Sequence, residues 1–325
     1  MTVREPVALI ETNLRWHSQL GAEALHVFFD DPADPAADAL PDLPGLRAIR
    51  CDAGFWRRRR NKKDRPDSQM RRQTINANLA QGRTDVDWLF HIDADEFMWC
   101  DGDLRSELGA MPAGHELNLP VLERVRPAAP RHAFDGPFRA TSKTDGAAAQ
   151  ATFGAFAPMM KQGQYSHGAG KGGVPVNAGL RLGVHNAMVR DGGDWHRAPA
   201  HVAQSTRLLH FDGITPLHWG LKFMRYALEP AEVRRSILQS HRRAQIEWML
   251  DRCESVATIH AAHQEMCGLT ATRRDALQRA GLLRDITFDP LTQIGAAQAE
   301  GFTEAFDADL LARNPWAAEI LGDAP

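Results

Sequence analysis

Apolar residues along the first two thirds of the chain follow two alternating patterns. Short segments of largely apolar residues predict strands, and the nearly continuous apolar run 88–92, with its β-branched and aromatic residues, predicts a buried one. Apolar residues at helical spacing between these runs predict helices, and Gly21 and Gly82 mark two helix ends. Strands that alternate with helices predict an α/β fold. The predicted strands are 25–29, 46–50, 88–92, 116–123, 180–185 and 207–212, and the predicted helices are 7–20 and 68–81.

Three acidic residues follow the third of these strands. The run 88–92 predicts a strand buried on both faces, in the middle of a parallel sheet, and Asp93, Asp95 and Glu96 come directly after it. Burying unpaired carboxylates is costly, and ligands of open α/β sheets bind beyond the carboxyl ends of the strands. Asp93 and Asp95 lie two residues apart and point to one side in an extended chain. They suit a hard divalent cation that keeps open positions for phosphate oxygens.

The string from Trp88 to Phe97, WLFHIDADEF, resembles the Asp-x-Asp segment of family 2-like glycosyltransferases with the GT-A fold. The likeness is greatest to the subgroup that carries Asp-x-Asp-Glu-Phe. The resemblance implies that Asp93 contacts a sugar-nucleotide and that Asp95 holds Mn²⁺ or Mg²⁺ on its diphosphate. The alternative interpretation of the same acids is a solvated acidic turn.

The glycine-rich stretch 165–175 is the second motif. Its glycines predict a mobile loop whose backbone comes close to a ligand, with Lys171 in the middle. His167, Gly170 and Lys171 are similar to a His-x-x-Gly-Lys segment of the same glycosyltransferase subgroup. Lys171 is therefore a candidate to neutralise a departing nucleoside diphosphate. A surface loop without a role in binding is the alternative.

The third motif is LLHFDGITPLHW, from Leu208 to Trp219, which resembles the same subgroup. The resemblance implies that His210 completes the metal sphere beside Asp93 and Asp95. The alternative is a histidine satisfied within the core. Thr215 is predicted to cap the helix that follows, with Pro216 at its first position.

Several residues in the first half are candidates for binding the nucleotide. The resemblance implies that an acid after the strand 25–29, Asp30 or Asp31, meets the nucleoside, although both also suit a turn.

In the helix 68–81 we expect Ile75 and Leu79 to be buried, whereas Arg72 and Asn76 share another face. The family has a helix at this place whose polar side chains turn toward the nucleotide, and the matching positions are Arg71, Arg72, Gln73 and Asn76. An exposed polar face is the alternative. The family also has a strand that ends in a Lys/Arg-x-Glu-like element. Only Met1–Glu5 corresponds to it here, so we expect either a very short strand or a start further upstream.

Composition narrows the function classes. A net charge of −3 argues against a general nucleic-acid surface, and four scattered cysteines indicate neither a zinc site nor a disulfide framework. No run of 18 apolar residues predicts a membrane span, so we expect a cytoplasmic protein. The stretch 57–63 carries six positive charges in seven residues. It is either a solvated loop or an electropositive rim that attracts a diphosphate-bearing donor.

These observations predict a GT-A domain over residues 1–228, with a mostly parallel central sheet flanked by helices. A helical extension over 229–325 would cover the core or form a homo-oligomer surface. The predicted activity is metal-dependent transfer of a sugar from a nucleotide-sugar to the hydroxyl of a glycan or another acceptor, in polysaccharide or glycoconjugate synthesis. Glu96, Asp212 and Glu123 are the candidate bases, and the sequence does not choose among them.

Two other classes of function fit parts of the pattern. One is a non-catalytic protein on the same fold that binds a nucleotide-sugar or a glycan. The other is a phosphotransferase with an Asp nucleophile, which also begins with Asp-x-Asp after a strand. That class needs a small hydroxyl residue two places after the second Asp, where this chain has Phe97.

Overall fold

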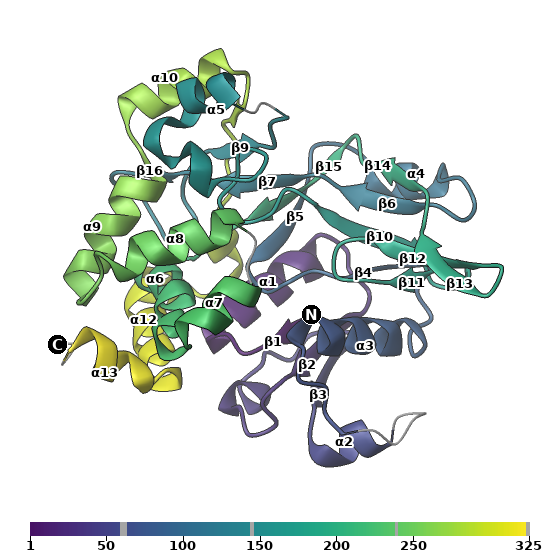
Figure 1. Cartoon of the computed structure of the whole chain (residues 1–325). Coiled ribbons are helices and arrows are strands. Elements are labelled where there is room, and N and C mark those ends of the chain that lie inside the picture. The colour runs from purple at the N-terminus through teal and green to yellow at the C-terminus, as the bar shows by residue number, and fades with distance from the viewer. Residues whose placement is uncertain (59–63, 144–145, 238–239, 323–325) are drawn as a thin grey trace. The chain divides into compact units, whose positions relative to one another are not determined.

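The computed structural model describes residues 1–58, 64–143, 146–237 and 240–322. The predicted α/β class is confirmed, with mixed sheets and many helices (Figure 1). The chain divides into two compact units, and each unit contains two segments of sequence. The first unit is Met1–Val121 with Ala169–Leu208, and the second is Leu122–Gly168 with Leu209–Pro325. This division does not coincide with the boundary expected at residue 228.

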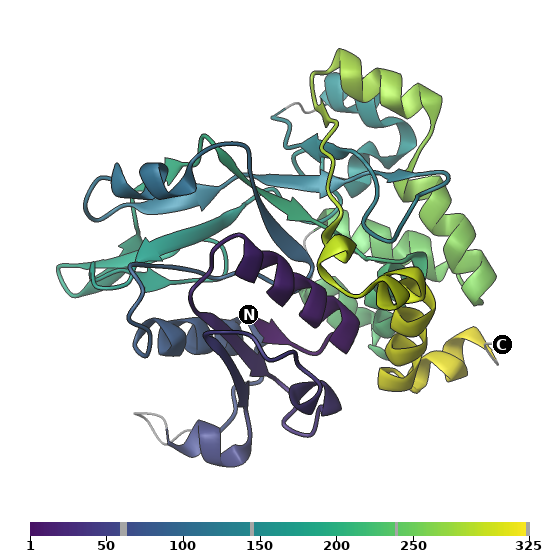
Figure 2. The same cartoon turned by 180° about the vertical axis from the view of Figure 1, so that it is seen from behind.

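The first unit begins with a small parallel sheet that the sequence predicts well. Its order is β1 (Thr2–Val3), β2 (Leu25–Phe29) and β3 (Leu46–Arg50), and Thr2 pairs with Phe28. Helix α1 (Val7–Gln19) lies in front of these strands in Figure 2, whereas α3 (Gln69–Gln81) lies in front of them in Figure 1. The two helices therefore cover opposite faces of the sheet. The helix predicted over 68–81 is confirmed as α3, and Ser68 is its N-cap.

A second sheet in the same unit corrects two predictions. Its order is β14 (Ala200–Val202), β6 (Glu116–Leu119), β10 (Lys171–Pro175) and β4 (Trp88–Phe90). The strand before the acids, β4, lies at the edge of this sheet and is antiparallel to β10, so the prediction of a central parallel strand is wrong. Parallel pairs occur only in part of the structure, and the expected mostly parallel sheet is replaced by mixed ones.

The prediction of a mobile glycine loop is also wrong for Lys171–Pro175, because this segment is the buried strand β10. Its glycines serve close packing. A Cβ atom on Gly173 would lie 2.1 Å from the ring of Phe90, and one on Gly172 would lie 2.4 Å from Oε2 of Glu116. The missing side chains let β10 lie against its neighbours, and apolar residues such as Leu117 and Val174 fill the adjoining core.

Shorter elements complete the first unit. The histidine-bearing strand β15 (Thr206–His210) begins in the first unit and ends in the second, as does β7 (Val121–Arg124). The other elements are η1 (Pro35–Asp38), α2 (Ala53–Arg57), β5 (Glu96–Cys100), α4 (Leu104–Gly109), β11 (Arg181–Leu182), β12 (Ala187–Asp191) and β13 (Asp194–Arg197). Most of the basic run 57–63 lies outside the described residues.

The second unit combines short strands with helices around an aromatic core. Strands β7 (Val121–Arg124), β9 (Phe138–Ala140) and β17 (Leu283–Arg284) pair antiparallel. The ring of Phe134 lies 5.3 Å from the rings of both Phe211 and Phe302. The first helix after β15 is capped by Thr215, as predicted.

Helices dominate the chain after residue 229, as the sequence predicts. The helices of the second unit are α5 (Gly146–Phe153), η2 (Gly154–Met159), α6 (Pro216–Met224), η3 (Arg225–Leu228), α7 (Ala231–Ile237), α8 (Ser240–Leu250), α9 (Val256–Cys267), α10 (Ala271–Arg279), η4 (Pro290–Gln293), α11 (Ala296–Glu300), α12 (Phe302–Arg313) and α13 (Trp316–Leu321); β8 (Arg126–Pro127) pairs with β16 (Gly268–Leu269). Among the described helices, none is long and apolar enough to cross a membrane.

His17 makes the first unit sensitive to acid. Its Nδ1 contacts the carbonyl oxygen of Asn13 at 2.8 Å, and its Nε2 accepts a hydrogen bond from the amide of Met98 at 3.1 Å. Burial lowers the pKa of His17 from 6.5 to about 4. Its contribution to stability is therefore complete above pH 6.5 and is lost as pH falls toward 4, because the unfolded state binds the proton first.

We predict that a His17→Gln variant loses less stability than the parent between pH 6.5 and pH 5. The difference in the free energy of unfolding should be about 1.5 kcal/mol, because the variant has no buried neutral imidazole that is protonated on unfolding. Urea unfolding at both pH values measures it. His201→Gln, at an exposed position of the same unit, is the control and should follow the parent. Equal acid sensitivity of parent and His17→Gln would contradict the assignment.

Candidate functional site

The acidic segment forms a tight loop between β4 and β5. The carboxylate of Glu96 accepts a hydrogen bond from the backbone N–H of Asp93 at 2.7 Å and is fully buried. The side-chain amide of Asn13, on α1, donates to the carbonyl oxygens of Ala94 at 3.1 Å and of Glu96 at 2.7 Å. The loop backbone is therefore fixed from two sides, while Asp93 and Asp95 remain partly exposed.

Lys171 provides the positive charge for this loop. Its ammonium lies 2.7 Å from Oδ2 of Asp93 and 3.3 Å from Oε2 of Glu96, and its side chain is completely buried. Burial alone would lower the pKa of Lys171, but the charges of Glu96 and Asp93 outweigh it and hold the pKa above its ordinary value. Because the ammonium is buried between two acids, its contacts indicate a positioning role rather than direct contact with a departing diphosphate.

Helix α3 turns a polar face inward, toward this loop and toward β2. The side-chain amide of Gln73 donates to Oδ1 of Asp93 at 2.9 Å, so Asp93 is held by a partner on each oxygen. Arg72, Gln73 and Asn76 are buried, whereas Ile75 and Leu79, expected to be buried, are only partly so. Gln73, which the resemblance implied would face the nucleotide, contacts the loop itself.

Asp30 and Arg72 form a buried pair at the carboxyl end of β2. The guanidinium of Arg72 donates to both carboxylate oxygens of Asp30, at 2.7 and 2.9 Å, and also to the carbonyl oxygens of Pro66 and Asp67. Arg65 adds a third contact to Asp30 at 2.8 Å. Arg72 therefore fixes the segment before α3, and its contacts are to protein groups.

The two remaining nucleotide candidates lie apart from this pair. Asp31 is exposed, and its carboxylate accepts from the amide of Ala33 in a turn, which is the alternative interpretation of this residue. Asn76 is buried and donates to the hydroxyl of Thr2 at 3.1 Å. Asn76 thus ties α3 to the short first strand.

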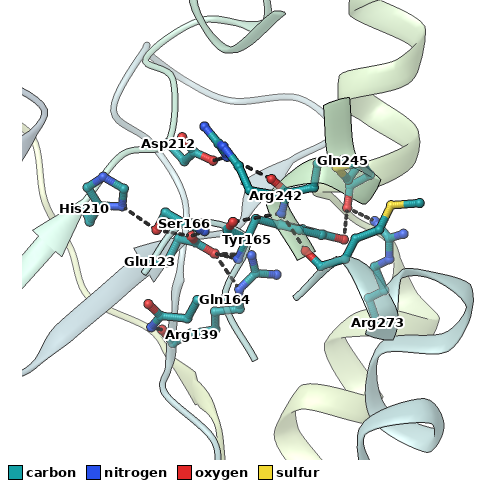
Figure 3. Close-up of polar contacts among 12 residues, drawn as sticks. Glu123, Arg139, Gln164, Tyr165, Ser166, His210, Asp212, Arg242, Gln245 and Arg273 are labelled. Atoms are coloured by element: carbon teal, nitrogen blue, oxygen red, sulfur yellow. Dashed lines mark hydrogen bonds and ion pairs between the residues drawn. The ribbon is translucent and has the colours of Figure 1, made fainter. Parts of the chain in front are cut away.

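His210 belongs to the second unit, where it joins a buried polar cluster (Figure 3). Its Nδ1 lies 3.0 Å from the hydroxyl of Ser166, and that hydroxyl donates to Glu123 at 2.6 Å. Glu123 also accepts from the amides of Tyr165 and Ser166 and pairs with Arg139. Burial alone would raise the pKa of Glu123, but the charge of Arg139 holds it below the ordinary value.

Asp212 lies near this cluster and is also paired. Its carboxylate lies 3.5 Å from Arg242 and 3.8 Å from Lys222, and only a tenth of its side chain is exposed. Burial opposes its charge, but Arg242 and Lys222 hold the pKa well below the ordinary value. Asp212 is therefore ionised at neutral pH and bound to two cations.

The first unit thus brings together Asp93, Glu96 and Lys171 in one site, with Gln73 and Asn13 as supporting residues. Of these two, Asn13 was not predicted from the sequence. The predicted metal ligands Asp93, Asp95 and His210 come from both units, and their assembly stays a prediction. The buried polar cluster of Glu123, Arg139, Ser166 and His210 is held together within the second unit by hydrogen bonds and one ion pair. No known family model matches the chain, and no curated protein matches it either.

We predict that Lys171→Met destabilises the protein by about 3–5 kcal/mol, because it leaves a buried carboxylate without its cation. Urea unfolding measures the change, and Lys143→Met, at an exposed position, is the control. Adding Glu96→Gln to Lys171→Met should recover part of the loss, since the uncompensated charge is then removed. If the loss of stability in the double variant equals the sum of the losses in Lys171→Met and Glu96→Gln, the assigned ion pair is contradicted.

Proposed function

We propose that the protein is a metal-dependent glycosyltransferase of GT-A type that uses a nucleotide-sugar donor. The observation that supports this most is the rigid loop of Asp93 and Asp95. Its backbone is held by Asn13 and Glu96, and both carboxylates stay partly open to solvent. A loop that is fixed while its acids remain open is suited to hold a ligand with little loss of side-chain entropy on binding.

The donor set suits Mn²⁺ or Mg²⁺. Carboxylate oxygens are the ligands these hard cations prefer, and both ions leave positions for phosphate oxygens. Each oxygen of Asp93 accepts a hydrogen bond, one from Gln73 and one from Lys171, and these bonds orient the carboxylate in the loop. Asp95 and His210 are proposed as the main ligands. When bound, the ion would offset the negative charge of a nucleoside diphosphate.

The three carboxylates considered as the catalytic base, which would activate the acceptor hydroxyl, are all paired with cations. Each of the three candidate carboxylates has a cationic partner: Glu96 has Lys171, Asp212 has Arg242, and Glu123 has Arg139. The cations hold the pKa of Glu123 and of Asp212 below the ordinary value, so these two carboxylates are weak proton acceptors. Glu96 is in addition fully buried. None of the three is favoured as the base by its surroundings.

This pairing gives weight to the second candidate function, a non-catalytic nucleotide-sugar-binding protein on the same fold. Release of nucleoside diphosphate from a panel of nucleotide-sugars, with Mn²⁺ and with added glycan acceptors, distinguishes the two. Turnover supports the enzyme, whereas metal-dependent binding without turnover supports the binding protein. The phosphotransferase alternative is less supported, because the position that needs a small hydroxyl is Phe97, which is fully buried.

We predict that Asp95→Asn weakens Mn²⁺-dependent binding of UDP or GDP at least tenfold, about 1.4 kcal/mol, and leaves the metal-free melting temperature nearly unchanged. The reason is that the residue is partly exposed and removal of its charge removes a metal ligand. Isothermal titration with and without Mn²⁺ measures it. Asp101→Asn, at an exposed position after β5, should behave as the parent. Unchanged metal dependence in Asp95→Asn would exclude the proposed role.

His210→Gln distinguishes a metal ligand from a core histidine. As a ligand, His210 can be replaced with little change in the metal-free melting temperature, while Mn²⁺ stabilises the variant much less than the parent. If His210 is instead a core residue that contacts Ser166, its replacement lowers the free energy of unfolding by about 1–3 kcal/mol without metal. Mn²⁺ then stabilises the variant and the parent equally. We predict the first pattern, measured by thermal unfolding, with His196→Gln at an exposed position as the control.

A further inference from the structure

The buried polar cluster of the second unit contains a short hydrogen-bond chain that ends at His210 (Figure 3). Glu123, on β7, accepts from the hydroxyl of Ser166 at 2.6 Å. The oxygen of that hydroxyl lies 3.0 Å from Nδ1 of His210, at the end of β15. The direction in which the hydrogen atoms of this chain point decides which ring nitrogen of His210 carries the proton.

Glu123 acts only as an acceptor in this chain. Its Oε2 accepts from Nε of Arg139 and from the amide of Tyr165, each at 3.0 Å, and its Oε1 accepts from the amide of Ser166 at 2.8 Å. All three of these partners are donors without an acceptor function, and the charge of Arg139 favours the ionised carboxylate. Because the carboxylate has no proton to donate, the single hydrogen of the Ser166 hydroxyl points to Oε1.

The direction of the Ser166 hydroxyl in turn fixes the proton of His210. With its hydrogen on Glu123, the hydroxyl offers only lone pairs to the ring. A neutral imidazole that bonds such an oxygen through Nδ1 carries its proton on Nδ1, and Nε2 then holds the lone pair. A ring nitrogen with a lone pair is the form in which histidine binds a metal ion, and a hydrogen bond from the other nitrogen commonly selects that form.

The backbone that carries Ser166 is held in place by other contacts. The side-chain amide of Gln245, on α8, donates to the carbonyl oxygen of Tyr165 at 2.8 Å. The hydroxyl of Tyr165 donates to the carbonyl oxygen of Met266 at 2.7 Å, and the guanidinium of Arg139 lies 4.5 Å from the centre of the Tyr165 ring. The Ser166 hydroxyl is therefore fixed between Glu123 and His210 by the fold itself, as a supporting residue of a binding site should be.

We propose that Glu123 and Ser166 are positioning residues that hold the proton of His210 on Nδ1 and present its Nε2 as the ligand atom for a divalent cation. This inference rests on the proposed function, in which His210 is a metal ligand, and it gives Glu123 a role other than that of the base. Orienting partners of this kind change metal affinity by about 10–100-fold.

The protonation of the His210 ring tests the hydrogen-bond chain without metal. Proton–nitrogen correlation spectra of protein with isotope-labelled histidine distinguish a protonated ring nitrogen from one with a lone pair. They are recorded at about pH 8, above the ordinary imidazole pKa of about 6.5, and the spectrum of His210→Gln assigns the His210 signals. We expect the Nδ1–H form in the parent and in Ser166→Thr, which keeps the hydroxyl, and both tautomers in Ser166→Ala. The Nε2–H form in the parent would overturn the proposal.

Calorimetric titration with Mn²⁺, in the presence of UDP or GDP, tests the consequence for binding. Ser166→Ala should weaken Mn²⁺ binding by about tenfold or more, and Ser166→Thr should retain most of the parent affinity. Ser255→Ala is the matched control, because it removes a hydroxyl of the same unit that caps α9 through the amide of Thr258. It should lower the melting temperature but leave the His210 tautomer and the Mn²⁺ affinity unchanged.

The two measurements separate this proposal from the proposed function. Mn²⁺ binding that is lost in His210→Gln but equal in the parent and in Ser166→Ala would overturn the positioning role. A parent with the Nδ1–H form that does not bind Mn²⁺ with either nucleotide would contradict the proposed function, and with it the ligand role of Nε2, while the hydrogen-bond chain itself would be confirmed.

Discussion

The buried ammonium of Lys171 is the interaction on which the proposed site depends. It is placed by β10, an inner strand of its sheet, and it balances the charges of Asp93 and Glu96. Without it, the fully buried Glu96 would be an uncompensated charge, and the backbone amide of Asp93 would lose a stable acceptor. The ion pair therefore fixes the loop that carries Asp95. Burial of the Lys171 ammonium costs desolvation free energy, and the attraction of two carboxylates, Asp93 and Glu96, offsets that cost.

The inward polar face of α3 extends this arrangement. Gln73 holds Asp93, Arg72 holds Asp30, and Asn76 contacts Thr2, so one helix ties together the ends of β1, β2 and β4. Each of these side chains is buried and hydrogen-bonded, which avoids the cost of an unpaired polar group. The helix places its polar residues where an ordinary amphipathic helix places apolar ones. The result is a polar framework around the proposed donor site.

Local signals in the sequence were sufficient for several elements. The strands β2 and β3 and the helix α3 are encoded within a few residues each, and their predicted bounds agree with the structure to within one residue. Interactions between distant residues were not predictable in this way. Lys171 lies 78 residues from Asp93, so its glycine-rich surroundings indicated a loop although they form a buried strand. The partner of Arg72 is 42 residues away, and the helix pattern therefore suggested an exposed or ligand-facing side chain.

The central proposal is that the loop of Asp93 and Asp95 binds a divalent cation together with a nucleoside diphosphate. Paramagnetic broadening of backbone amide signals by trace Mn²⁺, with UDP or GDP present, tests this claim most directly. The account predicts selective broadening at Ala94, Asp95, Glu96 and Phe97 that Mg²⁺ in excess reverses. Broadening centred instead on the exposed acids around Asp31, or no selective broadening at all, would contradict it.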